Sequence, residues 1–383
     1  MKARNFWVTK IEELLAKRNV VWLSGVRRVG KTTLCKQLVE DNRYFDCELP
    51  RIRDALTDPA HFLKRLGPGR IVLDEVHRLI NPSEILKIAS DHFQHTKVIA
   101  TGSSTLAAKK KFRDTLTGRK FELWLTPAIY SDLHALGCED LDERMIRGGL
   151  PPFLLGSGID DRNYVEWLDS YWSKDLQELF VIEKRSSFIK FLEMLFRQSG
   201  ELFEAQSFSA PCEVSRQTIQ NYLEVLETTL LITVLRPYSG GGVTELKSQP
   251  KVFGFDTGFI SYFRNWASAH DEARGHLLEH LVLNELNARF LRSQVFYWRN
   301  KQKHEVDFVV KAGRREEITA IECKVNTRRF SAGNLTVFRR LYPQGRNILV
   351  CLEPDEKIER TFNGLEVRCV PYHALGEELE SLL

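Results

Sequence analysis

The chain has 383 residues, of which 43% are hydrophobic and 28% charged, which describes a folded protein of two or three domains. It contains no apolar run long enough to cross a bilayer, and its start lacks the apolar core of a secretory signal, so we expect a cytoplasmic protein with no membrane partner. The seven cysteines never form a C-x-x-C pair, which argues against a disulfide framework and against a thiolate zinc site.

Charge is unevenly distributed along the chain. The formal net charge is +4, yet residues 289–346 carry fourteen Lys and Arg against five Asp and Glu, a local charge of +9. The remainder of the chain is therefore slightly acidic. A basic segment of this kind is typical of a contact with the phosphate backbone of nucleic acid, and a solvated basic face is the alternative.

The first expected element is a helix over 6–18, because Phe6, Trp7, Ile11, Leu14 and Leu15 recur at helical spacing. An apolar run at 20–24 follows and predicts a buried strand.

The clearest motif follows that strand and fits G-x-x-x-x-G-K-[ST] at every fixed position from Gly25 to Thr32. Glycines let backbone N–H groups point at a phosphate chain, and a helix over about 31–40 adds its positive end. We expect Lys31 to reach the outer phosphates of ATP and Thr32 to ligate Mg2+. A plain strand–turn–helix connection is the alternative. The residues expected to bind the nucleotide are Gly25, Val26, Arg27, Arg28, Val29, Gly30, Lys31, Thr32, Thr33 and Asp74.

A second motif ends a later strand. After a short strand at 43–49, a helix begins at Asp58-Pro59 and runs to Leu66. The run 71–77 is then typical of a buried parallel strand that ends in two carboxylates. Asp74 is expected to hold Mg2+ through its water shell, and Glu75 to orient and deprotonate the attacking water. An acidic loop without a chemical role is the alternative.

Further strands complete the expected sheet. A helix at 82–93 precedes a strand at 97–104, whose polar tip would lie between the carboxylates and the γ-phosphate. Ser103 is the expected catalytic hydroxyl there, with Thr101, Ser104 and a plain helix cap as alternatives. A helix at 106–116 leads to a strand at 121–125. This order predicts a doubly wound α/β sheet with its ligand at the carboxyl ends of the strands.

With these motifs in place, residues 1–185 resemble the prokaryotic branch of AAA+ ATPases whose loop often reads G-x-R-x-V-G-K-T-T. The Asp74-Glu75 strand, the strand tip at 101–104 and the Leu-Thr-Gly-Arg step at 116–119 match that branch. The resemblance implies an ATPase core over 1–128, a helical lid over 129–185, and a homo-oligomer, with a hexamer as the favoured assembly.

The same resemblance implies an arginine finger that acts catalytically across a subunit boundary. It is carried over onto Arg119, with Arg113 as the less favoured choice and an ordinary surface salt bridge as the alternative. Arg147 is a candidate for contacting the γ-phosphate from the lid.

Residues 186–250 change to three short helices followed by a strand at 230–236. Residues 214–223 are typical of the second half of a helix-turn-helix with Ser215 as its cap, and glycines at 240–242 would form a wing tip. The segment resembles a winged-helix module. It carries five basic and seven acidic residues, so strong backbone binding by this segment alone is not expected, and a structural connector fits equally well.

A second set of chemical residues lies in 251–383. Alternation along a strand places Glu322 and Lys324 on one face, and a hairpin with the strand at 305–310 would add Asp307 to it. Two carboxylates that hold Mg2+ and a lysine that stabilises charge on phosphorus are what metal-assisted phosphodiester hydrolysis requires. The spacing D-x(14)-E-x-K resembles the PD-(D/E)XK, or restriction-endonuclease-like, fold, with Val306 in place of the motif's proline. That resemblance implies Glu279 as a further metal ligand, whereas a surface salt bridge is the alternative.

The three-part order resembles a widespread prokaryotic family of ATPases that carry a nuclease-like C-terminal domain. We therefore expect an oligomeric, Mg2+-dependent ATP hydrolase that acts on DNA, including branched or single-stranded forms, with a C-terminal domain that binds or cuts it. One alternative is an ATP-dependent switch that recruits a partner through an inactive nuclease-like domain. A small-molecule kinase is disfavoured, because Glu75 suits the activation of water.

Overall fold

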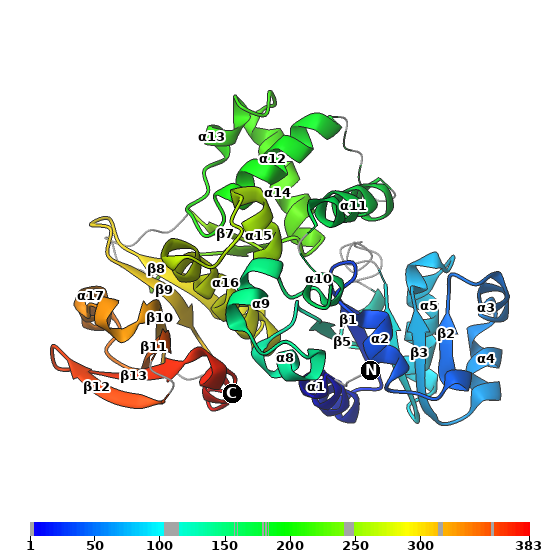
Figure 1. The fold of residues 1–383 in the computed structure, drawn as a ribbon. Coiled ribbons are helices and arrows are strands. Elements are labelled where there is room, and N and C mark those ends of the chain that lie inside the picture. Colours follow the sequence, from blue (N-terminus) through cyan, green and yellow to red (C-terminus); the bar gives the residue numbers. More distant parts are fainter. Residues whose placement is uncertain are drawn as a thin grey trace.

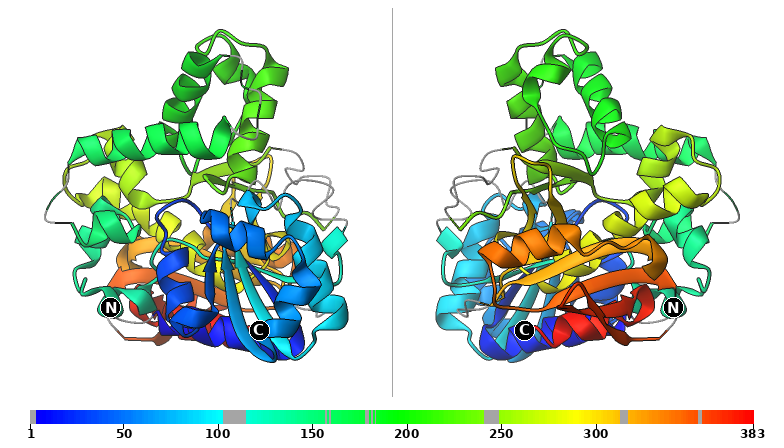
Figure 2. Two further views of the ribbon diagram at one scale, coloured as in Figure 1. Left: turned by 90° about the vertical axis from the view of Figure 1, so that its right-hand side faces the viewer. Right: turned by 90° about the vertical axis from the view of Figure 1, so that its left-hand side faces the viewer.

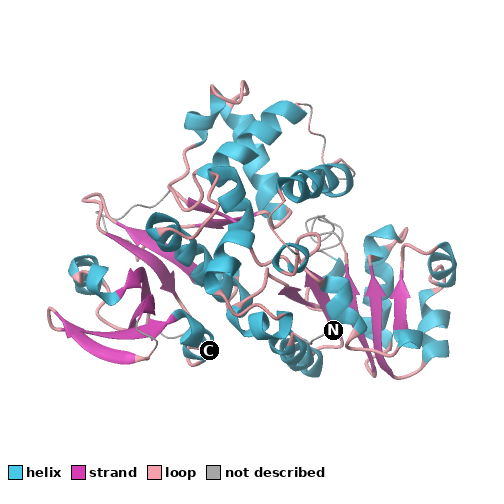
Figure 3. Ribbon diagram, viewed as in Figure 1, coloured by secondary structure: helices cyan, strands magenta, loops and turns pink. Residues whose placement is uncertain are grey.

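The computed structural model describes residues 4–102, 115–156, 158, 160–177, 180, 182, 184–240, 249–312, 317–353 and 356–383. Two β-sheets lie on opposite sides of the molecule, with helices between them (Figure 1). Figure 3 shows the same arrangement by secondary structure, with a short strand pair between the two large groups of strands.

The N-terminal sheet has five parallel strands in the order β2-β3-β4-β1-β5. Its central strands are apolar on both faces, as a sheet covered by helices on both sides requires. The strands are β1 (Val20–Ser24), β2 (Tyr44–Asp46), β3 (Gly69–Asp74), β4 (Thr96–Thr101) and β5 (Phe121–Trp124). The predicted α/β fold with a parallel sheet is confirmed.

Helices cover this sheet at α1 (Asn5–Lys17), α2 (Lys31–Lys36), α3 (Pro50–Ala55), α4 (Pro59–Leu66) and α5 (Pro82–His92). As predicted, Asp58 caps α4, accepting a hydrogen bond from the His61 N–H at 3.0 Å. Helix α2 ends at Lys36, earlier than expected. Helix α3 was not predicted, although Pro50 at its first position is a start signal; it shortens the strand expected at 43–49.

A helical region follows, with α8 (Tyr130–Leu136), α9 (Leu141–Arg147), α10 (Pro151–Leu154) and α11 (Asp161–Tyr171), which continues into a π-helical turn at Trp172–Leu176. Between α9 and α10, Gly148 has φ +86°, and a Cβ there would lie 2.0 Å from Asp256 Oδ1. A Cβ on Gly149 would lie 2.3 Å from Arg144 Nη2. Both positions therefore require glycine, because Gly148 packs against Asp256 and Gly149 packs against Arg144 and the backbone of Ala128.

Three helices project from the rest of the molecule in all three views of Figures 1 and 2: α12 (Arg185–Arg197), α13 (Ala205–Ser209) and α14 (Arg216–Thr228). Ser215 caps α14, accepting from the Thr218 N–H at 3.1 Å as expected. Strands β6 (Ile232–Leu235) and β7 (Lys251–Gly254) pair antiparallel, and α15 (Thr257–Arg264) follows. Most of the expected wing tip at 240–242 lies outside the described residues.

The C-terminal sheet has six strands in the order β12-β13-β11-β10-β9-β8. The antiparallel β8–β9–β10 run joins a parallel part in which β11 pairs with β10 and β13. The strands are β8 (Val295–Arg299), β9 (Glu305–Val310), β10 (Thr319–Asn326), β11 (Asn347–Glu353), β12 (Ile358–Phe362) and β13 (Leu365–Pro371). The helices are α16 (Asp271–Arg289), α17 (Gly333–Leu341) and α18 (Leu375–Glu380).

One continuous hydrophobic core connects the two sheets. It includes inward residues of β1 such as Val21, the helices α11, α12 and α16, and residues of the C-terminal sheet such as Ile321. Separate cores cover the outer face of the N-terminal sheet and the face of the C-terminal sheet that packs on α17. The middle helices are therefore the shared support of both sheets.

Buried polar contacts reinforce this shared core. Asn284 of α16 donates to the carbonyl oxygen of Pro127 at 3.0 Å, and Glu285 accepts from the Tyr130 N–H at 2.6 Å. Arg144 of α9 donates to Thr257 Oγ1 at 2.9 Å. Because a buried polar group without a partner is strongly destabilising, these pairs fix how the segments pack.

Candidate functional site

The glycine-flanked loop lies at the carboxyl end of β1 and leads directly into α2. Gly30, the residue before α2, has φ +103°, a conformation that side chains disfavour. A Cβ on Gly25 would lie 2.7 Å from the Leu125 carbonyl oxygen. Both glycines are therefore needed for this loop to form where the N-terminus of α2 can face an anion.

Lys31 lies inside this loop and donates to the carbonyl oxygens of Gly25 at 2.7 Å and Val26 at 3.1 Å. Burial lowers the pKa of Lys31, and this effect outweighs the nearby carboxylates, of which Glu75 is the strongest. The ammonium group is therefore held by weak neutral acceptors that an anionic phosphate can replace.

Asp74 is the last residue of β3 and is only 3% exposed. Its carboxylate accepts hydrogen bonds from three hydroxyl groups. Thr32 Oγ1 donates to Asp74 Oδ2 at 2.8 Å, and the hydroxyls of Tyr44 and Thr101 also donate to this carboxylate. Thr101 is the last residue of β4, which lies beside β3, so it ends at the same edge of the sheet as Asp74. Tyr44 is the first residue of β2, the strand on the other side of β3, and its side chain extends along β3 to reach Asp74. Thr101 was an alternative to Ser103 in the sequence, whereas Tyr44 was missed.

The donor set at this edge fits Mg2+. A carboxylate and a hydroxyl oxygen lie within 2.8 Å of each other beside the phosphate loop. Mg2+ favours oxygen ligands and is usually bound by one or two protein groups together with substrate phosphates and water. Asp74 and Thr32 are therefore suited to hold the ion with a bound nucleotide.

Glu75 follows β3 directly and adopts a left-handed backbone conformation, with φ 55° and ψ 44°. Its N–H donates to Thr101 Oγ1 at 3.1 Å, and its carboxylate lies 3.0 Å from His77 Nδ1. Burial alone would raise the pKa of Glu75, but the hydrogen bond with His77 and the charge of Lys31 outweigh it and lower that pKa. His77 was not singled out in the sequence, since it follows the motif without belonging to it.

Two adjoining cavities open beside the loop. The polar one, of about 420 Å³, is lined from the loop by Gly25, Val26, Arg27, Arg28, Gly30, Lys31, Thr32 and Thr33, and from elsewhere by residues that include Glu75, His77, Lys174 and Asp175. The other, of about 340 Å³, is mainly apolar and is lined by residues that include Leu34, Leu136, Pro151 and Leu155. Both are bordered by Gly30, Thr33 and the Pro151-Pro152 pair.

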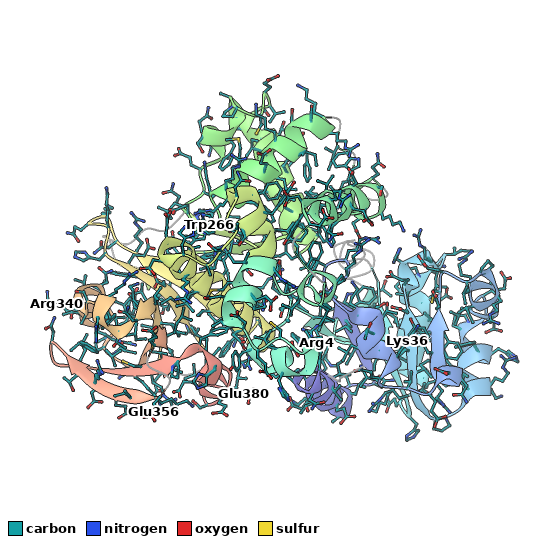
Figure 4. All side chains as sticks on the ribbon, viewed as in Figure 1. Arg4, Lys36, Trp266, Arg340, Glu356 and Glu380 are labelled. Atoms are coloured by element: carbon teal, nitrogen blue, oxygen red, sulfur yellow. The ribbon has the colours of Figure 1, made fainter. Side chains whose placement is uncertain are left out.

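The helical region holds the loop from outside. Arg27 Nε pairs with Asp175 at 3.0 Å, and the Trp167 indole N–H donates to the Arg27 carbonyl oxygen at 3.2 Å. The carbonyl oxygen of the buried Val29 accepts from Arg4 at 3.1 Å, and Arg4, which Figure 4 labels, also pairs with Asp132 of α8 at 2.7 Å. The loop is thus held by Arg4, just before α1, and by α11 with its π-helical turn, while α8 supports Arg4.

The remaining residues expected in the ATPase part are placed as follows. Ser103 and Arg113 lie outside the described residues. Arg119 lies just before β5, at the amino ends of the strands, whereas the loop lies at their carboxyl ends. Its side chain pairs with Asp91 at 2.7 Å on the surface. Arg147 is directed elsewhere, since it pairs with Glu143 at 2.9 Å and donates to the Gly156 carbonyl oxygen at 2.7 Å.

The structure also brings the second set of predicted residues together. Lys324 Nζ lies 3.4 Å from Asp307 Oδ2 and 3.2 Å from Glu322 Oε2, because β9 and β10 pair antiparallel. Burial and the neighbouring charge of Asp307 raise the pKa of Glu279 on α16 to about 8 and also raise the pKa of Glu322. Asp307, Glu322 and Lys324 thus form one acidic cluster, and Glu279 lies near enough for the charge of Asp307 to raise its pKa.

The chemistry of this cluster fits a divalent cation. The Glu322 Oε1 atom is buried and has no hydrogen-bond partner among the described residues, so it is available to a cation. As placed, the described side chains form no group of three or more His, Cys, Asp or Glu residues within reach of one metal ion. Asp307, Glu322 and Glu279 would therefore have to move closer together to hold one.

Comparisons with known proteins agree with the N-terminal geometry. Residues 17–134 match the family model of an AAA domain. These residues form an AAA-type P-loop domain. After this AAA-type domain, residues 138–270 and 274–371 match two domains of unknown function, DUF8612 and DUF4143.

Relatives extend over most of the chain. The uncharacterized protein Rv2008c of Mycobacterium tuberculosis is 26% identical over 317 residues, covering 80% of this chain and 70% of the relative. The uncharacterized protein MJ1544 of Methanocaldococcus jannaschii is 24% identical over 358 residues, covering 82% and 77%. Among solved structures, the Walker-type ATPase PABY2304 of Pyrococcus abyssi aligns with a TM-score of 0.48 and 16% identity, covering 69% of this chain and 96% of that one. Among the described residues, no helix has the length and apolarity needed to span a membrane.

Proposed function

We propose that the AAA-type domain binds ATP with Mg2+ and hydrolyses it to ADP and phosphate. The observation that carries this proposal is the contact of 2.8 Å between Thr32 and Asp74, directly beside Lys31 and Glu75. A phosphate-binding loop alone would suit any nucleotide-binding protein. A metal-binding pair together with an ionised carboxylate that can activate water supports hydrolysis.

Each of these residues has a separate role in hydrolysis, set by its place in the site. Lys31 exchanges its carbonyl acceptors for the outer phosphates, and Thr32 and Asp74 hold Mg2+, which when bound offsets charge on the phosphates. Glu75 is ionised at neutral pH, as its lowered pKa keeps it despite burial, and it takes a proton from water. The water oxygen forms a bond to the γ-phosphorus while the bond to the bridging oxygen breaks, so that ADP leaves. The apolar cavity beside Leu34 and Pro151 suits the base.

Two substitutions test this proposal. Lys31→Ala should abolish phosphate release and weaken nucleotide binding, whereas Glu75→Gln should abolish phosphate release but retain binding of a fluorescent ATP analogue. Lys64→Ala, on the outer helix α4, is the control for loss of a positive charge. Full turnover by a pure preparation of Lys31→Ala would refute the assignment.

We further propose that the protein acts as a homo-oligomer, with a hexamer favoured, in which Arg119 reaches the nucleotide of a neighbouring subunit. Its place at the sheet edge opposite its own phosphate loop supports a role in trans. The Asp91 pair is exposed to water and therefore weak enough to exchange. Oligomers of either variant, Arg119→Ala or Lys31→Ala, should be inactive. In mixed oligomers, an interface in which the Lys31→Ala subunit supplies Arg119 and the Arg119→Ala subunit supplies Lys31 should regain turnover. No recovery in a confirmed mixed oligomer would count against the finger.

A third proposal concerns DNA. The convergence of Asp307, Glu322, Lys324 and Glu279 within a sheet of mixed strands supports a nuclease-like C-terminal domain, and the basic segment 289–346 supports DNA binding. The three helices and the β6–β7 pair support a winged-helix-like unit before it. Asp307→Asn should stop Mg2+-dependent cleavage of single-stranded or branched DNA while ATP hydrolysis continues.

DNA affinity measured over a salt series separates this proposal from the alternative. Release of counterions predicts that affinity falls steeply as salt rises. Salt-sensitive binding without cleavage would indicate a DNA-binding domain that is catalytically inactive. Absence of both would favour the alternative, an ATP-dependent switch that recruits a protein partner.

A further inference from the structure

A lysine from outside the C-terminal sheet enters the acidic cluster. Lys251 is the first residue of β7, which pairs with β6 in the middle of the chain, yet its ammonium group forms an ion pair with Glu305 of β9. It also lies 5.7 Å from the centre of the Tyr297 ring. Only 6% of the residue is exposed, so substrate cannot reach it.

Glu305, the ion-pair partner of Lys251, lies next to the acidic cluster. Glu305 and Asp307 are two positions apart on one strand, so both side chains project from the same face. The charge of Lys251 acts on Glu279, Glu305 and Asp307. Lys324 acts on the same cluster from the other side, between Asp307 and Glu322.

This arrangement has an electrostatic consequence. A buried ammonium group is stable only when carboxylates offset its charge, and Lys251 meets that requirement through Glu305 beside the acidic cluster. A divalent cation held by Asp307 and Glu322 would lie beside the Lys251–Glu305 pair, because Glu305 is two positions from Asp307 on the same face of β9, and the ammonium group would repel it. Lys251 therefore disfavours a divalent cation in the cluster.

We propose that Lys251 is a resident counter-cation of the acidic cluster, supplied by β7, and that it weakens divalent-cation binding at Asp307 and Glu322. The proposal rests on the metal site proposed above. It makes β7, which lies outside the C-terminal sheet and within the segment 138–270 that matches DUF8612, one determinant of metal affinity.

Binding of Mn2+, followed by electron paramagnetic resonance of the free ion, tests the proposal on the full-length chain. All variants carry Asp74→Asn, so that the nucleotide site does not contribute. Lys251→Met retains the length of the side chain but removes its charge, and we expect Mn2+ to bind at least about tenfold more tightly. Glu305 keeps Arg299 as a partner at 2.8 Å, so the variant leaves it paired.

Three controls complete the experiment. Lys251→Arg should bind Mn2+ as the parent does, Lys301→Met in the exposed β8–β9 turn should have no effect, and adding Asp307→Asn to Lys251→Met should remove the gain. Thermal melting checks that each variant is folded, and Lys251→Gln replaces Lys251→Met if the latter is not. If Mn2+ binding depends on Asp307 but has the same affinity with and without Lys251, the role of Lys251 is overturned and the metal site stands. Absence of Asp307-dependent binding in every variant would overturn the metal site as well.

Discussion

Removal of the Asp256 carboxylate tests how firmly the glycine turn before α10 is attached to the rest of the molecule. Asp256 Oδ2 accepts from the Gly149 N–H at 2.6 Å, and Oδ1 accepts from the Gly258 N–H at 3.0 Å at the start of α15. The residue is 3% exposed, so water cannot replace these bonds in Asp256→Ala. Loss of the cap costs about 1 kcal/mol, and an unsatisfied buried N–H costs about 1–3 kcal/mol.

The total destabilisation is therefore about 3 kcal/mol. At about 2.1 cal/mol/K per residue, the entropy of unfolding this chain is roughly 0.8 kcal/mol/K, so we expect the melting temperature to fall by about 4 °C. Asp160→Ala is the matched control, because Asp160 caps α11 with a side chain that is 41% exposed, and it should lower the melting temperature by about 1 °C. Differential scanning calorimetry compares the two. Equal shifts would refute the reasoning.

Two further predictions concern the nucleotide site and the pH dependence of stability. Thr101→Val removes a hydroxyl donor to Asp74, so ATP turnover should need a severalfold higher Mg2+ concentration, and an unchanged Mg2+ titration would contradict this. Burial lowers the pKa of His280 from 6.5 to about 4, so between these values the unfolded chain takes up a proton that the folded chain does not, and stability falls as the pH falls. The melting temperature of His280→Gln should therefore fall less between pH 7 and pH 5 than that of the parent protein. An equal fall in both proteins would show that His280 does not contribute to the pH dependence.

The features that were predicted well are those encoded in short stretches. The loop from Gly25 to Thr32, the Asp74-Glu75 step and the cap at Asp58 each depend on neighbouring residues, so spacing alone reveals them. Alternation along β10 likewise placed Glu322 with Lys324.

The features that were missed depend on strand order and packing. Tyr44 reaches Asp74 because β2 lies beside β3, and the sequence does not state which strands are neighbours. Lys251 reaches Glu305 across two different sheets, and no local pattern links them. The helix α3 was overlooked for a local reason, since Leu49 was assigned to the preceding strand and Pro50 was not used as a start signal.

The shared core also governs how the protein can fold as it is synthesised. The Pro127 carbonyl oxygen and the Tyr130 N–H are bonded to side chains 157 and 155 positions later in the chain. At roughly 5–20 residues per second, a ribosome needs on the order of 10–30 s to supply those partners. During that interval the AAA-type domain lacks part of its packing, although its own strands are complete. The Pro127 carbonyl oxygen and the Tyr130 N–H therefore stay without these partners until α16 has emerged.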